Sequence, residues 1–281
     1  MKTYLSPYKI NLGLEVLSRR EDGYHNINTL FYRLDSPNDT LEVTEAPSFS
    51  LTTNDSSLPT NDKNLIVKTM HLAAQMDERE MPNLHIYLEK KLPMGAGIGG
   101  GSGNASTALD IYSDHIRPLS QEEKMSYAKW LGADVSFLTS GMRAAIGSCI
   151  GDELREIDFE IKNIVVLAKL KEVSIPTEEA YSNIVIQTDR KPTDIESVVK
   201  RPLKEWKDHL FNDFEQYAFE AYPDLQEVKD MMYDSGARFS LMSGSGSLIY
   251  GIFENINHSK AAALEILGHY RDAFVAAYVP E

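Results

Sequence analysis

The chain lacks the cysteines, the long apolar runs and the leader-like start of an exported or membrane protein. Its 281 residues include a single cysteine, Cys149, which rules out a disulfide within the chain and a zinc site built from several thiolates. No stretch approaches the roughly 18 uninterrupted apolar residues of a membrane span. Pro7, Lys9 and Asn11 interrupt the start of the chain, where an export signal needs unbroken apolar sequence. We therefore expect a cytoplasmic protein without a membrane partner.

Positive charge is also scarce. Lys and Arg number 28 against 42 Asp and Glu, which gives a formal net charge of -14 at pH 7. A nucleic-acid polymer is bound through clustered Lys and Arg, so this balance argues against such a partner. The seven histidines show no H-E-x-x-H spacing, which argues against a histidine-rich metal enzyme. Any anionic ligand must be held locally, by a few well-placed groups.

The length is about twice that of a usual domain, and the pattern predicts two α+β domains, residues 1–150 and 151–281. Alternating apolar residues predict strands within 9–17, 30–34, 40–45 and 84–88, and helical spacing predicts helices over 64–76 and 105–116. Asn61 or Asp62 is expected to cap the first helix. Later, 163–170 reads as a strand, 215–236 as a helix and 239–254 as a hairpin.

Six glycines fall in the nine residues Gly95 to Gly103, between the strand at 84–88 and the helix at 105–116. Glycines at a helix start expose backbone amides, which bind phosphate together with the positive end of the helix dipole. No Lys-Ser or Lys-Thr follows, so the Walker A pattern fails, and the elements of a protein kinase are missing. Gly95 to Gly100 does fit G-x-G-x-x-G, so a nicotinamide-dependent oxidoreductase remains an alternative, although a Rossmann loop normally lies in the first βαβ unit.

Three motifs in order resemble those of the GHMP kinases. They are Ser6-Pro7-Tyr8-Lys9-Ile10-Asn11-Leu12, the glycine loop from Pro93 to Asn104, and Met242-Ser243-Gly244-Ser245-Gly246-Ser247. Asp22-Gly23-Tyr24-His25, the Gly-Gly-Gly-Ser form of the loop and Gly132-Ala133-Asp134-Val135 resemble the branch that phosphorylates diphosphocytidyl-methylerythritol in non-mevalonate isoprenoid synthesis. This resemblance implies a two-domain α+β fold with the active-site cleft between the domains, ATP and Mg²⁺ as cofactors, and a small cytidine diphosphate substrate.

The resemblance also assigns the catalytic and nucleotide-binding residues. It makes Asp134 the base that takes the proton of the substrate 2-hydroxyl, and it places the Lys9 ammonium beside Asp134 to orient the acceptor oxygen. It assigns Asn64 and Lys90 to the ATP base and ribose. The phosphates would lie on a stretch formed by Pro93, Met94, Gly95, Ala96, Gly97, Ile98, Gly99, Gly100, Gly101, Ser102 and Gly103. Taken alone, Asp134 could be a cap, Lys9 a solvent-facing strand residue, Asn64 a helix-start residue and Lys90 a solvated charge.

The resemblance assigns the cytidine substrate to Asn11, Tyr24, His25, Thr177 and Tyr181. Tyr24 and Tyr181 would stack on the cytosine, and His25 would bind its edge. Read alone, Tyr181 is a helix-face residue and Tyr24 a loop residue.

The sequence departs from the family at Tyr8, Gly103 and Ser136, where alanine, serine and proline are common. These departures leave another GHMP small-molecule kinase, or a relative that binds nucleotide without turnover, as further alternatives. The residues that coordinate the metal and the oligomeric state do not follow from the sequence. Ser102 is the candidate for a hydroxyl near the metal or the terminal phosphate.

Overall fold

A computed structural model describes residues 1–187 and 189–280, and the chain divides into two compact units. Unit 1 contains Met1–Lys9, Pro37–Met94 and Gly99–Met142, and unit 2 contains Ile10–Ser36, Gly95–Ile98 and the residues from Arg143 on. The chain crosses between the units within β1 (Lys2–Arg19), within β2 (His25–Glu45) and within the glycine-rich stretch. Each unit is therefore built from stretches that are separate in sequence.

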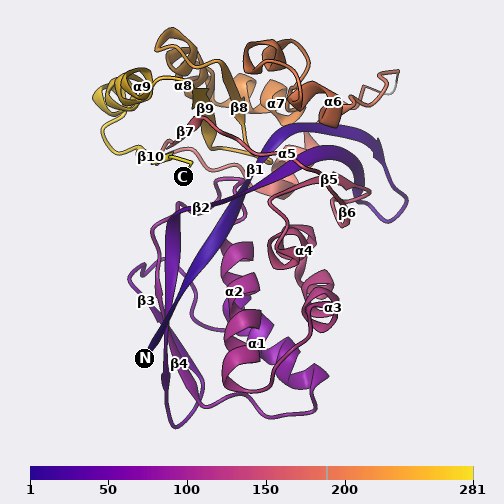
Figure 1. Ribbon diagram of the computed structural model, residues 1–281, viewed down its shortest axis with the longest axis vertical. Coiled ribbons are helices and arrows are strands. Elements are labelled where there is room, and N and C mark those ends of the chain that lie inside the picture. The colour runs from indigo at the N-terminus through magenta and orange to yellow at the C-terminus, as the bar shows by residue number, and fades with distance from the viewer. Residues whose placement is uncertain (188, 281) are drawn as a thin grey trace. The chain divides into compact units, whose positions relative to one another are not determined.

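Unit 1 is a sheet covered by helices. β4 (Leu84–Glu89) pairs antiparallel with the second half of β2 and parallel with β3 (Ser50–Thr53). The alternation of Leu84, Ile86 and Leu88 turns these three side chains into the core, where α1 (Leu65–Met76) and α2 (Gly100–His115) pack on the sheet (Figure 1). The remaining helices of the unit are α3 (Gln121–Leu131) and α4 (Ala133–Ser140).

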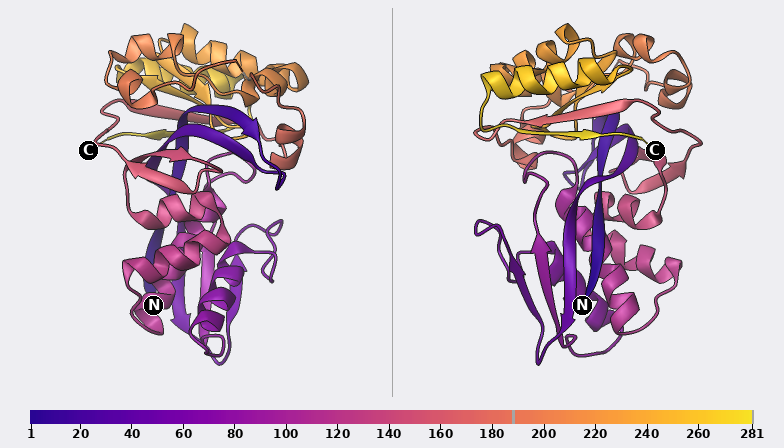
Figure 2. Two further views of the ribbon diagram at one scale, coloured as in Figure 1. Left: turned by 90° about the vertical axis from the view of Figure 1, so that its right-hand side faces the viewer. Right: turned by 60° about the vertical axis from the view of Figure 1, so that its left-hand side comes forward.

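Unit 2 contains an antiparallel sheet in the order β10-β7-β9-β8. Its strands are β7 (Ile164–Lys169), β8 (Phe239–Met242), β9 (Ile249–Phe253) and β10 (Phe274–Tyr278). α8 (Pro223–Asp234) and α9 (Ile256–His269) pack against this sheet (Figure 2). The first half of β2 pairs with β5 (Ala144–Ser148), which pairs with β6 (Glu153–Glu156). The shorter helices are α5 (Thr177–Ser182), α6 (Ile195–Val199), the 3-10 helix η1 (Leu203–Asp208) and α7 (Phe214–Ala221).

The α+β prediction is confirmed, and so are most of the predicted elements, with three corrections. The predicted strands at 30–34 and 40–45 are parts of one continuous strand, β2. The predicted helix at 215–236 is two helices, because Pro223 disfavours helical backbone at the residue before it and Tyr222 takes φ -135° and ψ 76°. The cap of α1 is Asn64 and not Asn61 or Asp62, since Asn64 Oδ1 accepts the Ile66 amide at 2.9 Å.

The length and apolar character of the helices bear on whether any of them could span a membrane. Within residues 1–187 and 189–280, none of them has both the length and the apolar character to cross a bilayer.

Candidate active site

Lys9 and Asp134, far apart in the sequence, lie together in unit 1. Lys9 Nζ is 3.4 Å from Asp134 Oδ2. β1 carries Lys9 between the fully buried Tyr8 and Ile10, and the Lys9 side chain is only 4% exposed. Asp134 lies in the first turn of α4, where the positive end of the helix dipole favours a carboxylate, and its side chain remains 34% exposed. The pair therefore presents a carboxylate that a buried ammonium holds in place.

Gly99, the residue before α2, packs against this pair. A Cβ on Gly99 would lie 3.3 Å from both Asp134 Oδ2 and Lys9 Cε. Gly99 also has φ 64°, in the left-handed region that favours glycine. The start of α2 therefore stands directly beside the Lys9–Asp134 pair, and the unpaired amides of a first helical turn attract phosphate.

The glycine at position 103 has a steric cause. A Cβ on Gly103 would overlap the carbonyl oxygen of Pro7 and would lie 3.0 Å from Ser6 Oγ. β1 thus approaches α2 so closely that a serine, which is usual at this place in the family, has no room without a backbone shift. The first-turn hydroxyl that remains is that of Ser102, which is half-buried.

The glycine loop interlocks with the Ser243–Ser247 loop inside unit 2. Ser243 Oγ donates a hydrogen bond to the Gly97 carbonyl oxygen at 3.0 Å, and a Cβ on Gly97 would overlap the Ser243 carbonyl oxygen. A Cβ on Gly244 would lie 2.6 Å from the Gly97 oxygen. The two loops can approach this closely only because both positions are glycine.

Asn64 and Lys90, the two residues assigned to the adenosine of ATP, have other contacts here. Asn64 caps α1 through Oδ1, and its Nδ2 donates to the Pro59 carbonyl oxygen at 2.8 Å. Lys90 Nζ forms a buried ion pair with Asp39 Oδ2 at 2.6 Å. Their roles toward ATP stay predictions.

Asn11 is buried in unit 2 and tied to three polar groups. Its Nδ2 donates to Thr29 Oγ1 at 2.9 Å, and its backbone amide donates to Ser243 Oγ at 3.3 Å. The hydroxyl of Tyr250 donates to its carbonyl oxygen at 2.8 Å. Ser243 thus contacts both Asn11 and the glycine loop, so one hydroxyl fixes two of the predicted site segments.

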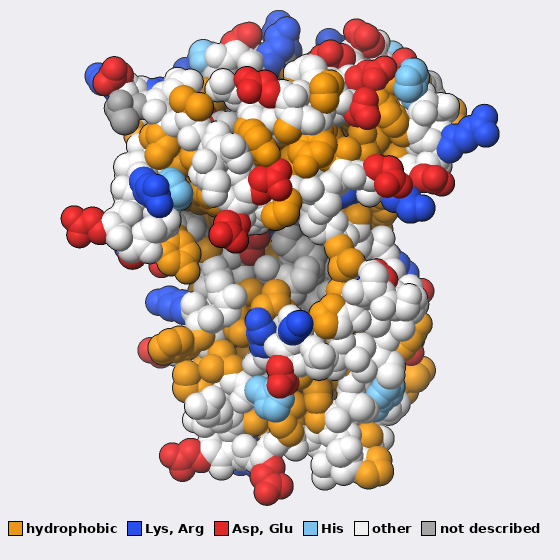
Figure 3. Space-filling view, turned by 180° about the vertical axis from the view of Figure 1, so that it is seen from behind, with side chains coloured by type: hydrophobic (Ala, Val, Ile, Leu, Met, Phe, Trp, Pro, Cys, Tyr) orange, Lys and Arg blue, Asp and Glu red, His pale blue; other side chains and the backbone are white. Residues whose placement is uncertain are grey.

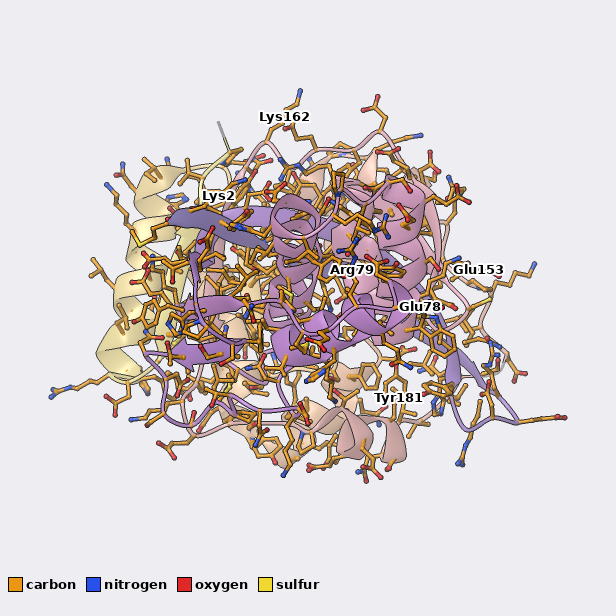
Figure 4. The ribbon with its side chains drawn as sticks, turned by 90° about the horizontal axis from the view of Figure 1, so that it is seen from below. Lys2, Glu78, Arg79, Glu153, Lys162 and Tyr181 are labelled. Atoms are coloured by element: carbon orange, nitrogen blue, oxygen red, sulfur yellow. The ribbon has the colours of Figure 1, made fainter. Side chains whose placement is uncertain are left out.

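The predicted cytosine residues form a partial aromatic cluster in unit 2. The His25 ring stacks on the Tyr181 ring, with centroids 4.8 Å apart and planes 26° apart. Tyr181 comes from α5 and is labelled in Figure 4. Tyr24 is 61% exposed, and Thr177 Oγ1 lies 3.2 Å from Ser245 Oγ. Burial and the nearby Arg19 lower the pKa of His25, which favours a neutral ring.

Two supporting residues escaped the sequence analysis. Asp39 binds Lys90, and Asn212 donates from Nδ2 to the carbonyl oxygens of Met242 and Gly244, both at 2.8 Å. Asn212 therefore fastens the base of the Ser243–Ser247 loop. Neither residue lies in a recognisable motif, and a short polar residue beside a turn gives no signal of its own.

The described residues contain no group of three or more His, Cys, Asp or Glu side chains arranged to hold a metal ion. Mg²⁺ in phosphoryl-transfer sites usually keeps several waters and binds one or two carboxylates together with substrate phosphates. A magnesium ion here would take most of its ligands from the phosphates and from water, and the half-buried Ser102 hydroxyl is the candidate protein ligand.

The glycine loop does not lie in a Rossmann βαβ unit. It follows β4, whereas the next strand after α2, β5, pairs with β2 and β6 and not with β4. A dinucleotide fold would place the two strands flanking the loop and helix in one parallel arrangement. This topology removes the structural basis of the nicotinamide alternative.

Known proteins resemble this chain over nearly its whole length. The family of GHMP kinases N terminal domains matches residues 64–148, and the family of GHMP kinases C terminal domains matches residues 194–272. The 4-diphosphocytidyl-2-C-methyl-D-erythritol kinase of Parabacteroides distasonis is 34% identical over 91% of this chain and 93% of its own length. The enzyme of that name from Cytophaga hutchinsonii is 38% identical over 87% and 90%.

The solved structures agree with the sequence relatives. A crystal structure of 4-(cytidine 5'-diphospho)-2C-methyl-D-erythritol kinase matches with a TM-score of 0.82 at 30% identity, over 100% of both chains. The mevalonate kinase of Methanococcus jannaschii matches with a TM-score of 0.76 at 13% identity, which reflects the shared fold alone. The chain therefore belongs to the GHMP kinases, in the family of the 4-diphosphocytidyl-2-C-methyl-D-erythritol kinases.

Proposed function

We propose that this kinase transfers the γ-phosphoryl group of ATP to the 2-hydroxyl of 4-diphosphocytidyl-2-C-methyl-D-erythritol, a step of non-mevalonate isoprenoid synthesis in the cytoplasm. The observation that carries the proposal is the Lys9–Asp134 pair, 3.4 Å apart and packed against Gly99 at the start of α2. The names and coverage of the relatives support the choice of substrate.

Asp134 accepts the proton of the 2-hydroxyl as the hydroxyl oxygen bonds to the γ-phosphorus and the bond to the β,γ-bridging oxygen breaks, which releases ADP. Lys9 is already enclosed, so it holds Asp134 and the acceptor oxygen in one geometry without reorganising. The glycine-loop amides stabilise the charge spread over the transferred group, which is the main task of a protein in phosphoryl transfer. A magnesium ion bound with the phosphates would supply further charge neutralisation, with the Ser102 hydroxyl as the candidate protein ligand.

The same proposal assigns the cytidine to the aromatic cluster of unit 2. The stacked pair of His25 and Tyr181 supports a planar ligand there. We infer that Tyr24 and Tyr181 lie on either side of the base. In the free protein His25 covers one face of the Tyr181 ring, and the base replaces His25 on that face when it binds. His25 then turns to the base edge, and Asn11 and Thr177 bind the remainder of the substrate.

The functional division of the chain follows the two matched families. We assign the N-terminal ATP-binding domain to residues 1–150 and the C-terminal domain to 151–281, which is supported by matches at 64–148 and 194–272.

An ADP-release assay tests the function. The purified protein is given ATP and Mg²⁺ with diphosphocytidyl-methylerythritol, mevalonate or homoserine, and ³¹P and ¹³C NMR then locate the new phosphate. We expect turnover with the cytidine substrate and phosphate on its 2-hydroxyl. Turnover on mevalonate or homoserine alone contradicts the substrate, and no turnover on any of the three favours a relative that only binds nucleotide. A parallel assay of NAD(P)H absorbance tests the oxidoreductase alternative.

A further inference from the structure

A fully buried carboxylate lies behind the segment that enters the glycine loop. Asp39, on β2, is 0% exposed. Its Oδ1 accepts the backbone amides of Lys91 and Leu92, both at 2.8 Å, and its Oδ2 accepts Lys90 Nζ at 2.6 Å. The three donors come from consecutive residues, which connect the end of β4 to Pro93. One carboxylate therefore fixes the whole connection.

Because Asp39 is buried, its carboxylate needs all of these contacts. A carboxylate removed from water is costly unless it is paired and hydrogen-bonded, and here one cation and two amides compensate it. Removing the charge would leave a buried ammonium and two amides short of a strong acceptor. The path of the backbone from Lys90 to Leu92 thus depends on Asp39.

Lys90 itself lies at the positive end of α2. Its Nζ would be 3.5 Å from a Cβ on Gly100, the first residue of that helix, and its side chain is only 6% exposed. An ammonium beside a helix N-terminus is electrostatically unfavourable unless an anion accompanies it. Asp39 supplies that anion from within unit 1, and it leaves part of the three-donor capacity of the ammonium for a ligand phosphate or hydroxyl.

We propose that Asp39 is a positioning residue for the nucleotide, which holds Lys90 and the backbone of Lys91 and Leu92 in register with the start of α2. This inference rests on the proposed function, in which ATP phosphates lie at that helix start. Asp39 does not touch the reacting atoms. Its effect is therefore on the affinity for ATP, and the affinity for the cytidine substrate and the chemical step are left nearly unchanged.

The test measures the kinetics of three variants: Asp39→Asn, Lys90→Met and the double variant that carries both changes. Glu89→Gln is the control. Glu89 is a matched control because it is the adjacent carboxylate at the same strand end, 2.8 Å from Lys91 Nζ, but both partners are more than 40% exposed. We expect Asp39→Asn to raise the KM for ATP roughly ten-fold or more. The KM for the cytidine substrate and kcat should stay within about two-fold. The loss of ATP-binding free energy in the double variant should be smaller than the sum of the two single losses, because both changes remove the same Asp39–Lys90 contact. Glu89→Gln should change nothing.

Other outcomes overturn the inference. An equal rise in both KM values, a fall in kcat alone, or a lower melting temperature with an unchanged KM for ATP would leave Asp39 a purely structural role. If Asp39→Asn does not fold, Lys90→Met decides, because it keeps the carboxylate and its two backbone amides. An unchanged KM for ATP in Lys90→Met contradicts the proposal.

The proposed function and this inference fail separately. Calorimetric titration of the same variants with ATP and Mg²⁺, without the second substrate, measures nucleotide affinity directly. Wild-type protein that binds ATP but releases no ADP with the cytidine substrate contradicts the proposed function alone. Equal ATP affinities of wild type, Asp39→Asn and Lys90→Met contradict the role of Asp39 alone.

Discussion

At the scale of single residues, Asp134 carries the sharpest prediction. Asp134→Asn keeps the shape of the side chain but removes the group that accepts the hydroxyl proton. We expect kcat to fall by about 10² to 10⁴, the usual contribution of a positioned base, with ATP affinity nearly unchanged. An ADP-release assay measures kcat, and calorimetric titration with ATP measures the affinity. Full activity in this variant would remove Asp134 from the mechanism and leave it only the electrostatic role of an acidic residue in the first turn of α4.

The aromatic residues of unit 2 carry a second prediction. Tyr24→Ala and Tyr181→Ala should each raise the KM for the cytidine substrate roughly 5- to 150-fold, because stacking on a base contributes about 1–3 kcal/mol. The KM for ATP should not change. Tyr181→Phe keeps the ring and serves as the matched control, with near wild-type values expected. If Tyr24→Ala has no effect while Tyr181→Ala does, the base stacks on one ring only, and the exposed Tyr24 has no part in the site.

Sequence and structure differ in what they reveal about these residues. The glycine cluster was readable directly, because glycine is needed where φ is positive and where backbones meet. The pairing of Lys9 with Asp134 was inferred only through resemblance, since no local pattern connects a strand lysine to a distant helix start. Asp39 and Asn212 could not be found at all. Their role depends on which backbone groups the fold brings to them.

At the scale of elements, the end of α1 is fastened by a carboxylate network within unit 1. Asp77, the C-cap of α1, accepts Arg117 Nε at 2.8 Å and Tyr127 Oη at 2.8 Å, together with Tyr112 Oη at 3.1 Å. The hydrogen bonds from Arg117, with smaller contributions from the two tyrosines, lower the pKa of Asp77 to about 2. The network connects α1, α2 and α3, so it stabilises the helical layer beside the glycine loop.

Acid should weaken this network, because it protonates Asp77. The folded-state pKa of Asp77 lies below its ordinary value of 3.8, so its contribution to stability is fully present above about pH 4 and is lost as the pH falls toward 2. We expect Asp77→Asn to lower the free energy of unfolding at pH 7 by about 1–3 kcal/mol, since it leaves buried donors without a charged acceptor. The difference between wild type and variant should shrink below pH 4. Urea unfolding at a series of pH values measures it.

Asp114→Asn is the control for that series. Asp114 also accepts a cation and a tyrosine hydroxyl, from Lys2 at 2.5 Å and Tyr4 at 2.8 Å, but its side chain is 43% exposed. An exposed pair of this kind contributes little to stability, because water and salt screen it. A loss in Asp114→Asn as large as that in Asp77→Asn would show that burial does not control the effect.

The elements themselves were predictable where one periodicity dominated. β4, α1 and the β8–β9 hairpin followed from alternation or helical spacing alone. The predictions for β2 and for the helix at 215–236 were wrong because they depend on interactions that sequence periodicity does not reveal. β2 runs on through residues 35–39, although its two halves pair with different strands, β5 and β4. The helix at 215–236 breaks where Pro223 restricts Tyr222.

At the scale of the whole molecule, the charge of -14 leaves the task of anion binding to local groups. Acidic and basic side chains are both spread over the face shown in Figure 3. The groups that we assign to ATP are few, namely the buried Asn64 and Lys90 and the amides at the start of α2. Binding should therefore depend on the folded arrangement and not on a general attraction of the surface.

A ligand that binds only the folded protein raises its thermal stability, and this gives a test that needs no turnover. At a concentration of 100 times its Kd, ATP with Mg²⁺ should stabilise the native protein by about 2.7 kcal/mol, which corresponds to a rise in melting temperature of roughly 5 °C for a chain of this size. Asp134→Asn should keep this rise, because the base is not needed to bind the nucleotide. Asp39→Asn, with about ten-fold weaker binding, should keep only about half of it at the same ATP concentration. NADH should produce no shift. Differential scanning fluorimetry over a range of ligand concentrations measures all four, and stabilisation by NADH without stabilisation by ATP would contradict the assignment of the glycine loop to ATP.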